Sequence, residues 1–276
     1  MKKKIRLLLL FALPVLLIYL VIGFKNNLTI TEYDYTNAKI PSAFDGYKIL
    51  QISDLHCKNF GTEQSELIQA INSCQPDLIV LTGDIVDEDH SSIKPLYDLI
   101  AGLNQQYPIY YVSGNHELEP DAAKNVNDMH DIFQSYGVID LDDKMVTIEK
   151  GEDSICLYGQ KFRSRYVVQY LETVDQTKFN ILLYHGSDFF DLIAPFNYDL
   201  VFSGHIHGGV VQLPFVGGLV SPDGSLFPEF DKGMFPLGNS TLIASAGLGE
   251  TRAPRFYNDP EIVVVTLHST SGNNQE

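Results

Sequence analysis

The chain has 276 residues, of which 45% are hydrophobic and 20% are charged, a composition typical of a globular protein with one large core or two modest ones. Its formal net charge is −16. Five basic residues and no acidic ones lie in the first 25 positions, so the remainder carries 14 basic and 35 acidic residues. Since nucleic-acid binding depends on clustered Lys and Arg, this balance argues against general nucleic-acid binding.

An apolar run follows the basic N-terminus. Residues 7–24 read LLLLFALPVLLIYLVIGF, which is eighteen residues without a charge. Such a run is close to the minimum for a membrane-spanning helix, and no small-residue cleavage site follows it. We therefore expect a retained, single-pass cell-membrane anchor over residues 1–25. The basic end would stay in the cytoplasm, and the acidic body would be extracytoplasmic.

The rest of the chain predicts a layered α/β fold. Residues 26–46 are expected to be a linker and lead-in strand, 47–268 one folded domain and 269–276 a flexible tail. Strands are predicted at 47–53, 77–84, 108–115, 179–186, 199–205, 241–247 and 261–267, a hairpin at 145–159, and helices at 62–74, 91–106, 121–137 and around 187–194. Strands that alternate with helices and then become hairpin-like favour mixed sheets. Residues 208–238 lack periodicity and predict a long functional loop.

Five predicted strands end in polar motifs. These motifs supply Asp54 and His56, then Asp84, then Asn115, His116 and Glu117, then His185, and finally His205 and His207. Taken singly, each motif is more typical of a turn or of a core histidine. Because the carboxyl ends of strands in an open α/β sheet face a common crevice, we expect the five motifs to converge.

This donor set indicates a metal site. Carboxylate, imidazole and amide groups without thiolate suit Mn, Fe, Zn or Co, and manganese is favoured here. Seven donors are too many for one tetrahedral zinc and suit two ions that share a carboxylate. Two ions about 3.5–4 Å apart can clamp an in-line displacement at phosphorus and activate a bridging hydroxide. The sequence therefore predicts metal-assisted phosphoester hydrolysis.

The five motifs, in this order, resemble those of the calcineurin-like metallophosphoesterases across nearly all of residues 47–267. The resemblance implies a four-layer sandwich of two mixed β-sheets flanked by helices. It implies one metal on Asp54, His56 and His207, a second on Asn115, His185 and His205, and Asp84 as the bridge between them. It also implies that His116 lies over the leaving-group oxygen as general acid or as a hydrogen-bond donor in the transition state, with Glu117 as its orienting neighbour.

Within that family, the N-terminal apolar run and the segment GLGETRAPRF resemble the bacterial membrane-associated branch. That branch includes phosphodiesterases and enzymes that cleave the pyrophosphate of a lipid-linked UDP-sugar. It often has a Pro-Ile-Arg segment soon after Gly-Leu-Gly, where this chain has ETRAPRF. Arg252 and Arg255 are candidate contacts for substrate phosphate, and a surface arginine is the alternative interpretation.

The leading hypothesis is a membrane-anchored dimetal phosphoesterase that cleaves phosphodiester or pyrophosphate bonds of a lipid-linked or envelope-derived substrate. One alternative is a phosphomonoesterase or nucleotidase that acts on small phosphates. Another is a non-catalytic surface protein that keeps the fold for binding. The complete donor set and His116 favour an enzyme.

Overall fold

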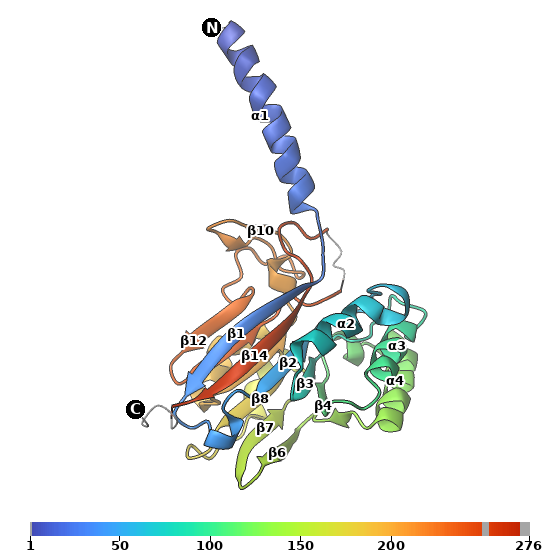
Figure 1. The fold of residues 1–276 in the computed structure, drawn as a ribbon, viewed down its shortest axis with the longest axis vertical. Helices are drawn as coiled ribbons and strands as arrows, with labels where there is room; N and C mark the ends of the chain where they lie inside the picture. Colours follow the sequence, from blue (N-terminus) through green and yellow to red (C-terminus); the bar gives the residue numbers. More distant parts are fainter. Residues whose placement is uncertain (1, 250–253, 271–276) are drawn as a thin grey trace.

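The computed structural model describes residues 2–249 and 254–270 (Figure 1), without the side chains of residues 2–9. Within these residues, the first of two large sheets has six strands in the order β1, β14, β2, β3, β4, β5. Their bounds are Thr29–Asn37, Glu261–Ser269, Lys48–Ile52, Leu78–Thr82, Ile109–Val112 and Ile139–Asp140. Strands β2 to β5 run parallel, whereas β14 pairs antiparallel with β2 and parallel with β1. This sheet is mixed, as predicted.

The second sheet is also mixed. Its described strands follow the order β12, β13, β9, β8, β7, β6. Their bounds are Gly233–Leu237, Ser240–Ala244, Leu200–Gly204, Asn180–Gly186, Asp153–Gly159 and Lys144–Lys150. The four central strands are parallel, and both edge strands pair antiparallel with their neighbours.

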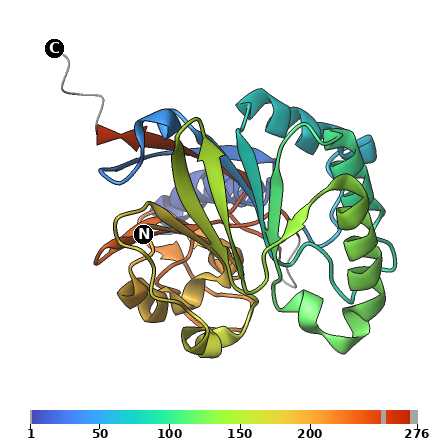
Figure 2. The same ribbon diagram turned by 90° about the horizontal axis from the view of Figure 1, so that it is seen from below.

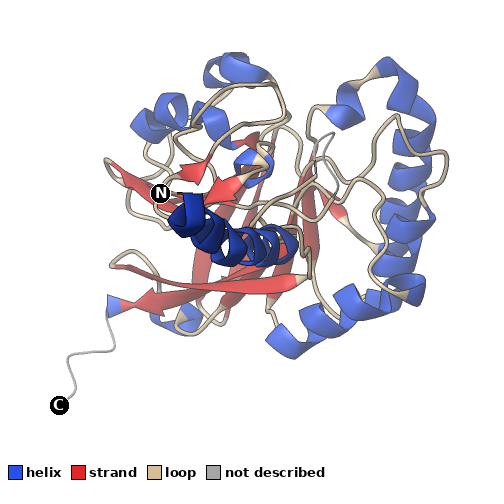
Figure 3. Ribbon diagram, turned by 90° about the horizontal axis from the view of Figure 1, so that it is seen from above, coloured by secondary structure: helices blue, strands red, loops and turns tan. Residues whose placement is uncertain are grey.

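The two sheets face each other, and helices cover their outer faces (Figures 2 and 3). Apolar side chains such as Ile49, Val80, Ile181 and Phe202 form a core between the sheets. A second core lies between the first sheet and helices α2 (Ser65–Cys74), α3 (Lys94–Leu103) and α4 (Ala123–Tyr136). A third lies outside the second sheet, where α5 (Phe190–Ile193) and short 3-10 turns pack. The result is four layers.

Most predicted elements are present, but the stretch 208–238 is not a plain loop. It contains a small hairpin of β10 (Gln212–Leu213) and β11 (Gly217–Gly218), and edge strand β12 begins at Gly233. These strands are short and rich in Gly and Pro, so neither helical nor alternating periodicity marks them.

The apolar N-terminal run forms helix α1 (Lys2–Gly23), which projects away from the body of the molecule (Figure 1). Among the helices in the described part of the chain, none combines the length and hydropathy that crossing a membrane requires.

Candidate metal centre

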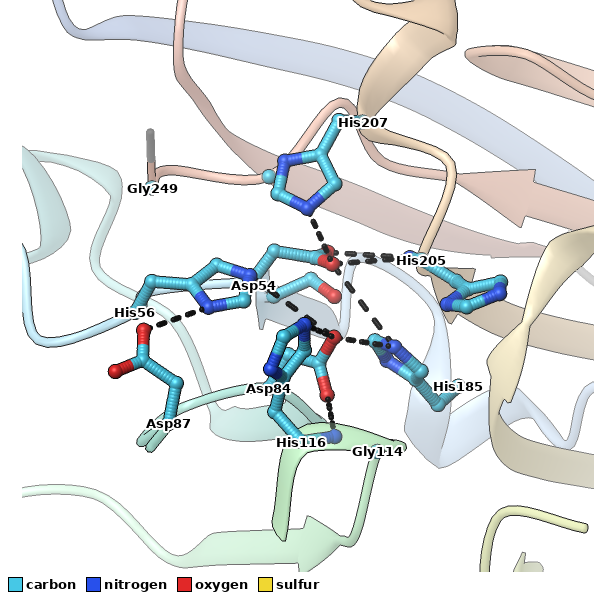
Figure 4. Close-up of polar contacts among 12 residues, drawn as sticks. Asp54, His56, Asp84, Asp87, Gly114, His116, His185, His205, His207 and Gly249 are labelled. Carbon is cyan, nitrogen blue, oxygen red and sulfur yellow. Dashed lines mark hydrogen bonds and ion pairs between the residues drawn. The ribbon is translucent and has the colours of Figure 1, made fainter. Parts of the chain in front are cut away.

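The five polar motifs converge where strands of both sheets end (Figure 4). Asp54 and His56 follow β2, Asp84 follows β3, Asn115 and His116 follow β4, His185 lies near the end of β8, and His205 and His207 follow β9. Among the described residues, three groups of His and Asp side chains have ligand atoms within 4.8 Å of one another: Asp54 with His56 and His207, Asp84 with His185 and His205, and His56 with Asp84 and His116. The sequence prediction of convergence is confirmed.

The backbone bends sharply just after the strands. Asp54, Asp84, His205 and His207 all have positive φ, at 50°, 51°, 79° and 49°. This left-handed conformation is uncommon outside glycine and costs of order 1–3 kcal/mol per residue. Because this conformation recurs at four of the predicted metal ligands, contacts with the surrounding structure must stabilise these turns.

Neighbouring glycines let the turns approach each other closely. A Cβ on Gly114 would lie 2.6 Å from the amide nitrogen of Asp84. A Cβ on Gly204 would lie 2.9 Å from Ser53 Cβ and would also collide with the carboxylate of Asp54. The Gly-Asn and Gly-His pairs in the sequence therefore reflect a steric need for glycine beside the donors.

Asp84 lies between the two histidine groups. Its Oδ2 is 3.0 Å from His185 Nε2, 3.9 Å from His56 Nε2 and 4.0 Å from His116 Nε2. Its Oδ1 accepts a hydrogen bond from the backbone N–H of His116 at 2.9 Å. Burial alone would raise the pKa of Asp84, but the charge of His185 and the other histidines holds it well below its usual range. This carboxylate is placed to be shared.

Asp54 is the carboxylate of the group that contains His56 and His207. Its Oδ1 lies 3.4 Å from His207 Nε2 and accepts a hydrogen bond from the His205 backbone N–H at 3.1 Å. The rings of His56 and His207 stack beside it with centroids 5.2 Å apart. Burial raises the pKa of the Asp54 carboxyl. Such a buried carboxylate is stable in its charged form only beside a cation.

The histidine hydrogen bonds leave ring nitrogens facing the centre. His185 Nδ1 lies 2.7 Å from the carbonyl oxygen of Thr82, so this nitrogen carries a proton and Nε2 faces Asp84 Oδ2. Two acceptors 3.0 Å apart need a proton or a metal between them. Among the described residues, His56 Nε2 and Asn115 Oδ1 are buried and lack a hydrogen-bond partner. This nitrogen and this oxygen are therefore available as metal ligands.

The pKa shifts of three histidines are consistent with a metal centre. Burial opposes the charged form of His185, but Asp84 and Asp54 outweigh it and raise the pKa of His185 to about 10. Burial and the charge of His185 lower the pKa of His205 to about 3. Burial, with His56 and Arg255 nearby, holds the pKa of His207 well below its usual range. His205 and His207 are therefore neutral, as metal ligands must be.

His116 occupies the rim of the centre. Its side chain is 27% exposed, whereas those of Asp84 and His185 are almost completely buried. Its Nδ1 lies 2.8 Å from Glu88 Oε2, which fixes the ring orientation. The carboxylate that hydrogen-bonds the His116 ring is thus that of Glu88.

Glu117 lies against backbone. Its carboxylate accepts hydrogen bonds from four backbone N–H groups, those of Asp84, Ile85, Val86 and Gly114, at 2.6–3.1 Å. Burial and the charge of Asp84 raise its pKa to about 7. These bonds tie the turn after β3 to the turn after β4, so Glu117 orients the Asp84 and Asn115 motifs together.

Sequence reasoning missed three residues that support the donors. Asp87 Oδ2 lies 3.0 Å from His56 Nδ1, Glu88 contacts His116, and Asn258 Nδ2 donates to the backbone oxygen of His207 at 2.6 Å. A signal for the two acids exists, because a metal-binding histidine needs an acceptor for its other ring nitrogen and DEDH follows Asp84 closely. Asn258 has no comparable signal.

The structure describes one of the two candidate arginines. Arg252 lies outside the described residues. Arg255 is 3% exposed, and its guanidinium donates to the backbone oxygens of Gly249 and Ala246 at 2.8–3.0 Å. It also lies 3.2 Å from His207 Nδ1. The phosphate contact predicted for these arginines stays a prediction.

Comparison with known proteins agrees with the geometry. The family model described as calcineurin-like phosphoesterase matches residues 47–209. The metallophosphoesterase YkuE of Bacillus subtilis (strain 168) is 32% identical over 87% of this chain and 86% of its own length. The phosphodiesterase YaeI of Escherichia coli (strain K12) is 25% identical over 80% of this chain and 82% of its own.

A third relative is the UDP-2,3-diacylglucosamine pyrophosphatase LpxG of Chlamydia muridarum (strain MoPn / Nigg), which is 23% identical over 87% of this chain and 89% of its own. The family match covers more than half of this chain, and its five motifs form the centre described above. The chain belongs to the calcineurin-like phosphoesterases, a family of metal-dependent phosphoester hydrolases.

Proposed function

We propose that this protein is a membrane-anchored phosphoesterase that uses two divalent metal ions, with manganese favoured, to cleave a phosphodiester or pyrophosphate bond. The substrate is a lipid-linked or envelope-derived phosphoester. The observation that carries the proposal is the pair of donor groups joined through Asp84, with ring nitrogens and an amide oxygen left unsatisfied between them.

The donor groups divide into two sites. Asp54, His56 and His207 would hold one ion, Asn115, His185 and His205 would hold the other, and Asp84 would contact both. When bound, the two ions would polarise the phosphoryl oxygens and activate an attacking water. The protein supplies neutral imidazoles at His205 and His207, two buried carboxylates, and glycine turns that keep the donors close.

His116 is placed to handle the leaving group. It is the more exposed histidine of its group, and Glu88 fixes its Nδ1, so its Nε2 can point toward a bound ester. A proton held at Nε2 would pass to the departing oxygen, and Glu88 would stabilise the positive charge on the ring beforehand. Glu117 acts indirectly, through the backbone turns that carry Asp84 and Asn115.

The surroundings of His205 favour a diester over a monoester. A cavity of about 210 Å³ borders His205, and its lining includes Asp188, Asp191, Asp223 and Glu229. Negative side chains repel the second charge that a monoester carries on its phosphorus, whereas a diester and each phosphoryl group of a diesterified pyrophosphate carry a single charge. Burial raises the pKa of Asp188 to about 6, which still leaves this carboxyl mostly charged at neutral pH.

Two observations support a lipid-bearing substrate. Helix α1 exposes apolar side chains along its length, with Phe11, Leu13, Leu17 and Val21 each between 61% and 68% exposed. An exposed apolar helix on an acidic body is typical of membrane attachment. The name of the relative LpxG describes hydrolysis of the pyrophosphate that joins uridine to a diacylated sugar.

The test compares hydrolysis of bis(4-nitrophenyl) phosphate, 4-nitrophenyl phosphate and a lipid-linked pyrophosphate by full-length protein with Mn²⁺, Zn²⁺ or Co²⁺. We expect the diester or pyrophosphate to be cleaved and the monoester to be poor. His116→Ala should reduce turnover of these substrates by about 10²–10⁴-fold, which is what general acid catalysis contributes. His130→Ala, on α4 and away from the donors, is the matched control.

A strong monoester preference would instead favour the nucleotidase alternative. If no phosphoester is cleaved with any of the three metals, and His116→Ala has no effect, the protein is a binding module.

A further inference from the structure

Residues 255–258, here called the bridge segment, lie between His207 and the base of helix α1. We infer that the bridge segment positions His207 and makes metal binding at His207 depend on how α1 packs against the protein. The inference rests on the proposed role of His207 as a metal ligand.

On one side, the bridge segment holds the chain around His207. Asn258 is completely buried, and its Nδ2 donates to the backbone oxygens of His207 and Val210 at 2.6 and 3.2 Å. Phe256 forms backbone hydrogen bonds with two residues that follow His207. Its N–H donates to the backbone oxygen of Val210 at 3.3 Å, and its backbone oxygen accepts from the N–H of Gln212 at 2.9 Å. The strained turn after β9 is thus held by the bridge segment.

The bridge segment packs closely against the turn that carries His207. Gly208 has φ of 64°, and a Cβ at this position would lie 2.7 Å from Asn258 Oδ1. Arg255 Nη2 lies 3.2 Å from His207 Nδ1, and the same guanidinium is fixed by backbone oxygens of residues 246–249. His207 therefore has neighbours from the bridge segment at both its backbone and its ring.

On the other side, the bridge segment contacts α1. The backbone N–H of Tyr257 donates to Gly23 at 2.6 Å, and its hydroxyl donates to the backbone oxygen of Tyr19 at 3.0 Å. The rings of Tyr19 and Tyr257 lie 4.9 Å apart, as do those of Phe24 and Phe256. A Cβ on Gly23 would lie 2.7 Å from Tyr257 Cε2 and would collide with the Phe256 ring.

The two sets of contacts come from four consecutive residues. Arg255 and Asn258 face His207, while Phe256 and Tyr257 pack on α1. No spacer separates them, so a shift of Phe256 or Tyr257 moves the donors that hold His207. Coupling of this kind is reciprocal, and metal binding at His207 must in turn favour the packed position of α1.

The first test measures Mn²⁺ binding to full-length protein in detergent micelles by calorimetry. Asn258→Ala should weaken one of the two metal equivalents by about tenfold or more and leave the other unchanged. Asn180→Ala is the matched control, because Asn180 is also buried and donates to two backbone oxygens, but it lies at the start of β8, whereas His185 lies near the end of that strand. It should lower stability without changing either equivalent.

The second variant acts from the helix. Gly23→Val should displace Phe256 and Tyr257 and weaken the same metal equivalent as Asn258→Ala, by at least threefold. Ala12→Val introduces the same side chain at an exposed position of α1 and should have no effect.

A spectroscopic readout tests the reverse direction. The chain has no Trp, so Tyr19→Trp places a single tryptophan at the contact between α1 and the bridge segment. We expect Mn²⁺ to change its emission, and Asn258→Ala to abolish that change at equal metal occupancy. The inference is overturned if Gly23→Val binds both metals like the wild type, or if the tryptophan does not respond.

These readouts separate the inference from the proposed function. If the wild type binds metal with the expected coupling but hydrolyses no phosphoester, only the proposed function fails. If it binds no metal, both fail.

Discussion

A carboxylate behind His56 determines which of its ring nitrogens faces the proposed metal. Asp87 accepts from His56 and is itself shared with His90, whose Nδ1 lies 2.7 Å from Asp87 Oδ1. Burial would raise the pKa of Asp87, but its hydrogen bonds with these two histidines bring it down to about 2. Asp87 is therefore charged at any working pH and holds the protonated Nδ1 of His56, which leaves Nε2 for a metal.

Removing Asp87 should therefore act on metal binding. Asp87→Ala leaves the His56 ring without its acceptor, and we expect a loss of about 10–100-fold in affinity for the ion that His56 holds, measured by calorimetry. Asp87→Asn keeps an acceptor oxygen and should restore most of the loss. Asp199→Ala, which removes another buried carboxylate away from the centre, should lower stability alone. Equal metal affinity in Asp87→Ala and the wild type would contradict the orienting role.

His185 leads to a prediction about pH. Its pKa of about 10 in the metal-free protein means that it is protonated at neutral pH, and a metal must displace that proton. Because the competing proton is lost as the pH rises toward that value, affinity should increase about tenfold per pH unit between about pH 6 and 8. Calorimetry in buffers with different ionisation enthalpies should show release of about one proton or more. Affinity that does not change with pH would contradict this account.

At the scale of elements, the centre depends on how strands end. Gly204 closes β9 against Ser53 and Asp54, whereas Gly137 ends α4 with φ of 73° and has open space, with no atom within 4 Å, where a Cβ would lie. Glycine is needed at position 204 because a side chain would collide with Ser53 and Asp54, and it is favoured at position 137 because of the positive φ. The same substitution at the two positions should therefore have different consequences.

Gly204→Ala should displace Asp54 and abolish binding of the ion that Asp54 and His207 hold. Gly137→Ala should cost about 1 kcal/mol of folding stability, from the positive φ alone, and leave metal binding intact. Thermal unfolding and metal titration of the two variants measure this difference. If both variants bind two metals equally well, the close approach at Gly204 is not needed for the site.

Much of this architecture could be predicted from periodicity and strand-end motifs. The strands that carry donors are apolar runs bounded by Gly, Asp or Asn, and Gly137 marked the end of α4 correctly. Strands β10, β11 and β12 escaped because two-residue or Gly- and Pro-rich strands carry no period of their own and form only through their partners. Asn258 escaped for a related reason: its role comes from lying beside His207, 51 residues away in sequence.

At the scale of the whole molecule, charge and apolar surface are separated. The basic residues of the N-terminus precede an apolar helix, and the acidic excess lies in the body that carries the metal centre. A body of this charge is repelled by anionic lipid surfaces, so the proposed membrane association would have to come from the apolar helix. Because apolar contacts are insensitive to ionic strength, high salt should not release the protein from membranes.

A charge within the helix tests this attachment directly. Leu17→Lys replaces a 61% exposed apolar side chain in α1, and burying a lysine at the centre of a bilayer costs roughly 2.5–3.5 kcal/mol. We expect its binding to phospholipid vesicles, measured by flotation, to fall by about 100-fold relative to the wild type. Ile139→Lys introduces the same charge at an exposed position of the body and should float like the wild type. If Leu17→Lys also floats like the wild type, or if salt strips the wild type from vesicles, α1 is not the anchor, and the case for a lipid-linked substrate loses its structural support.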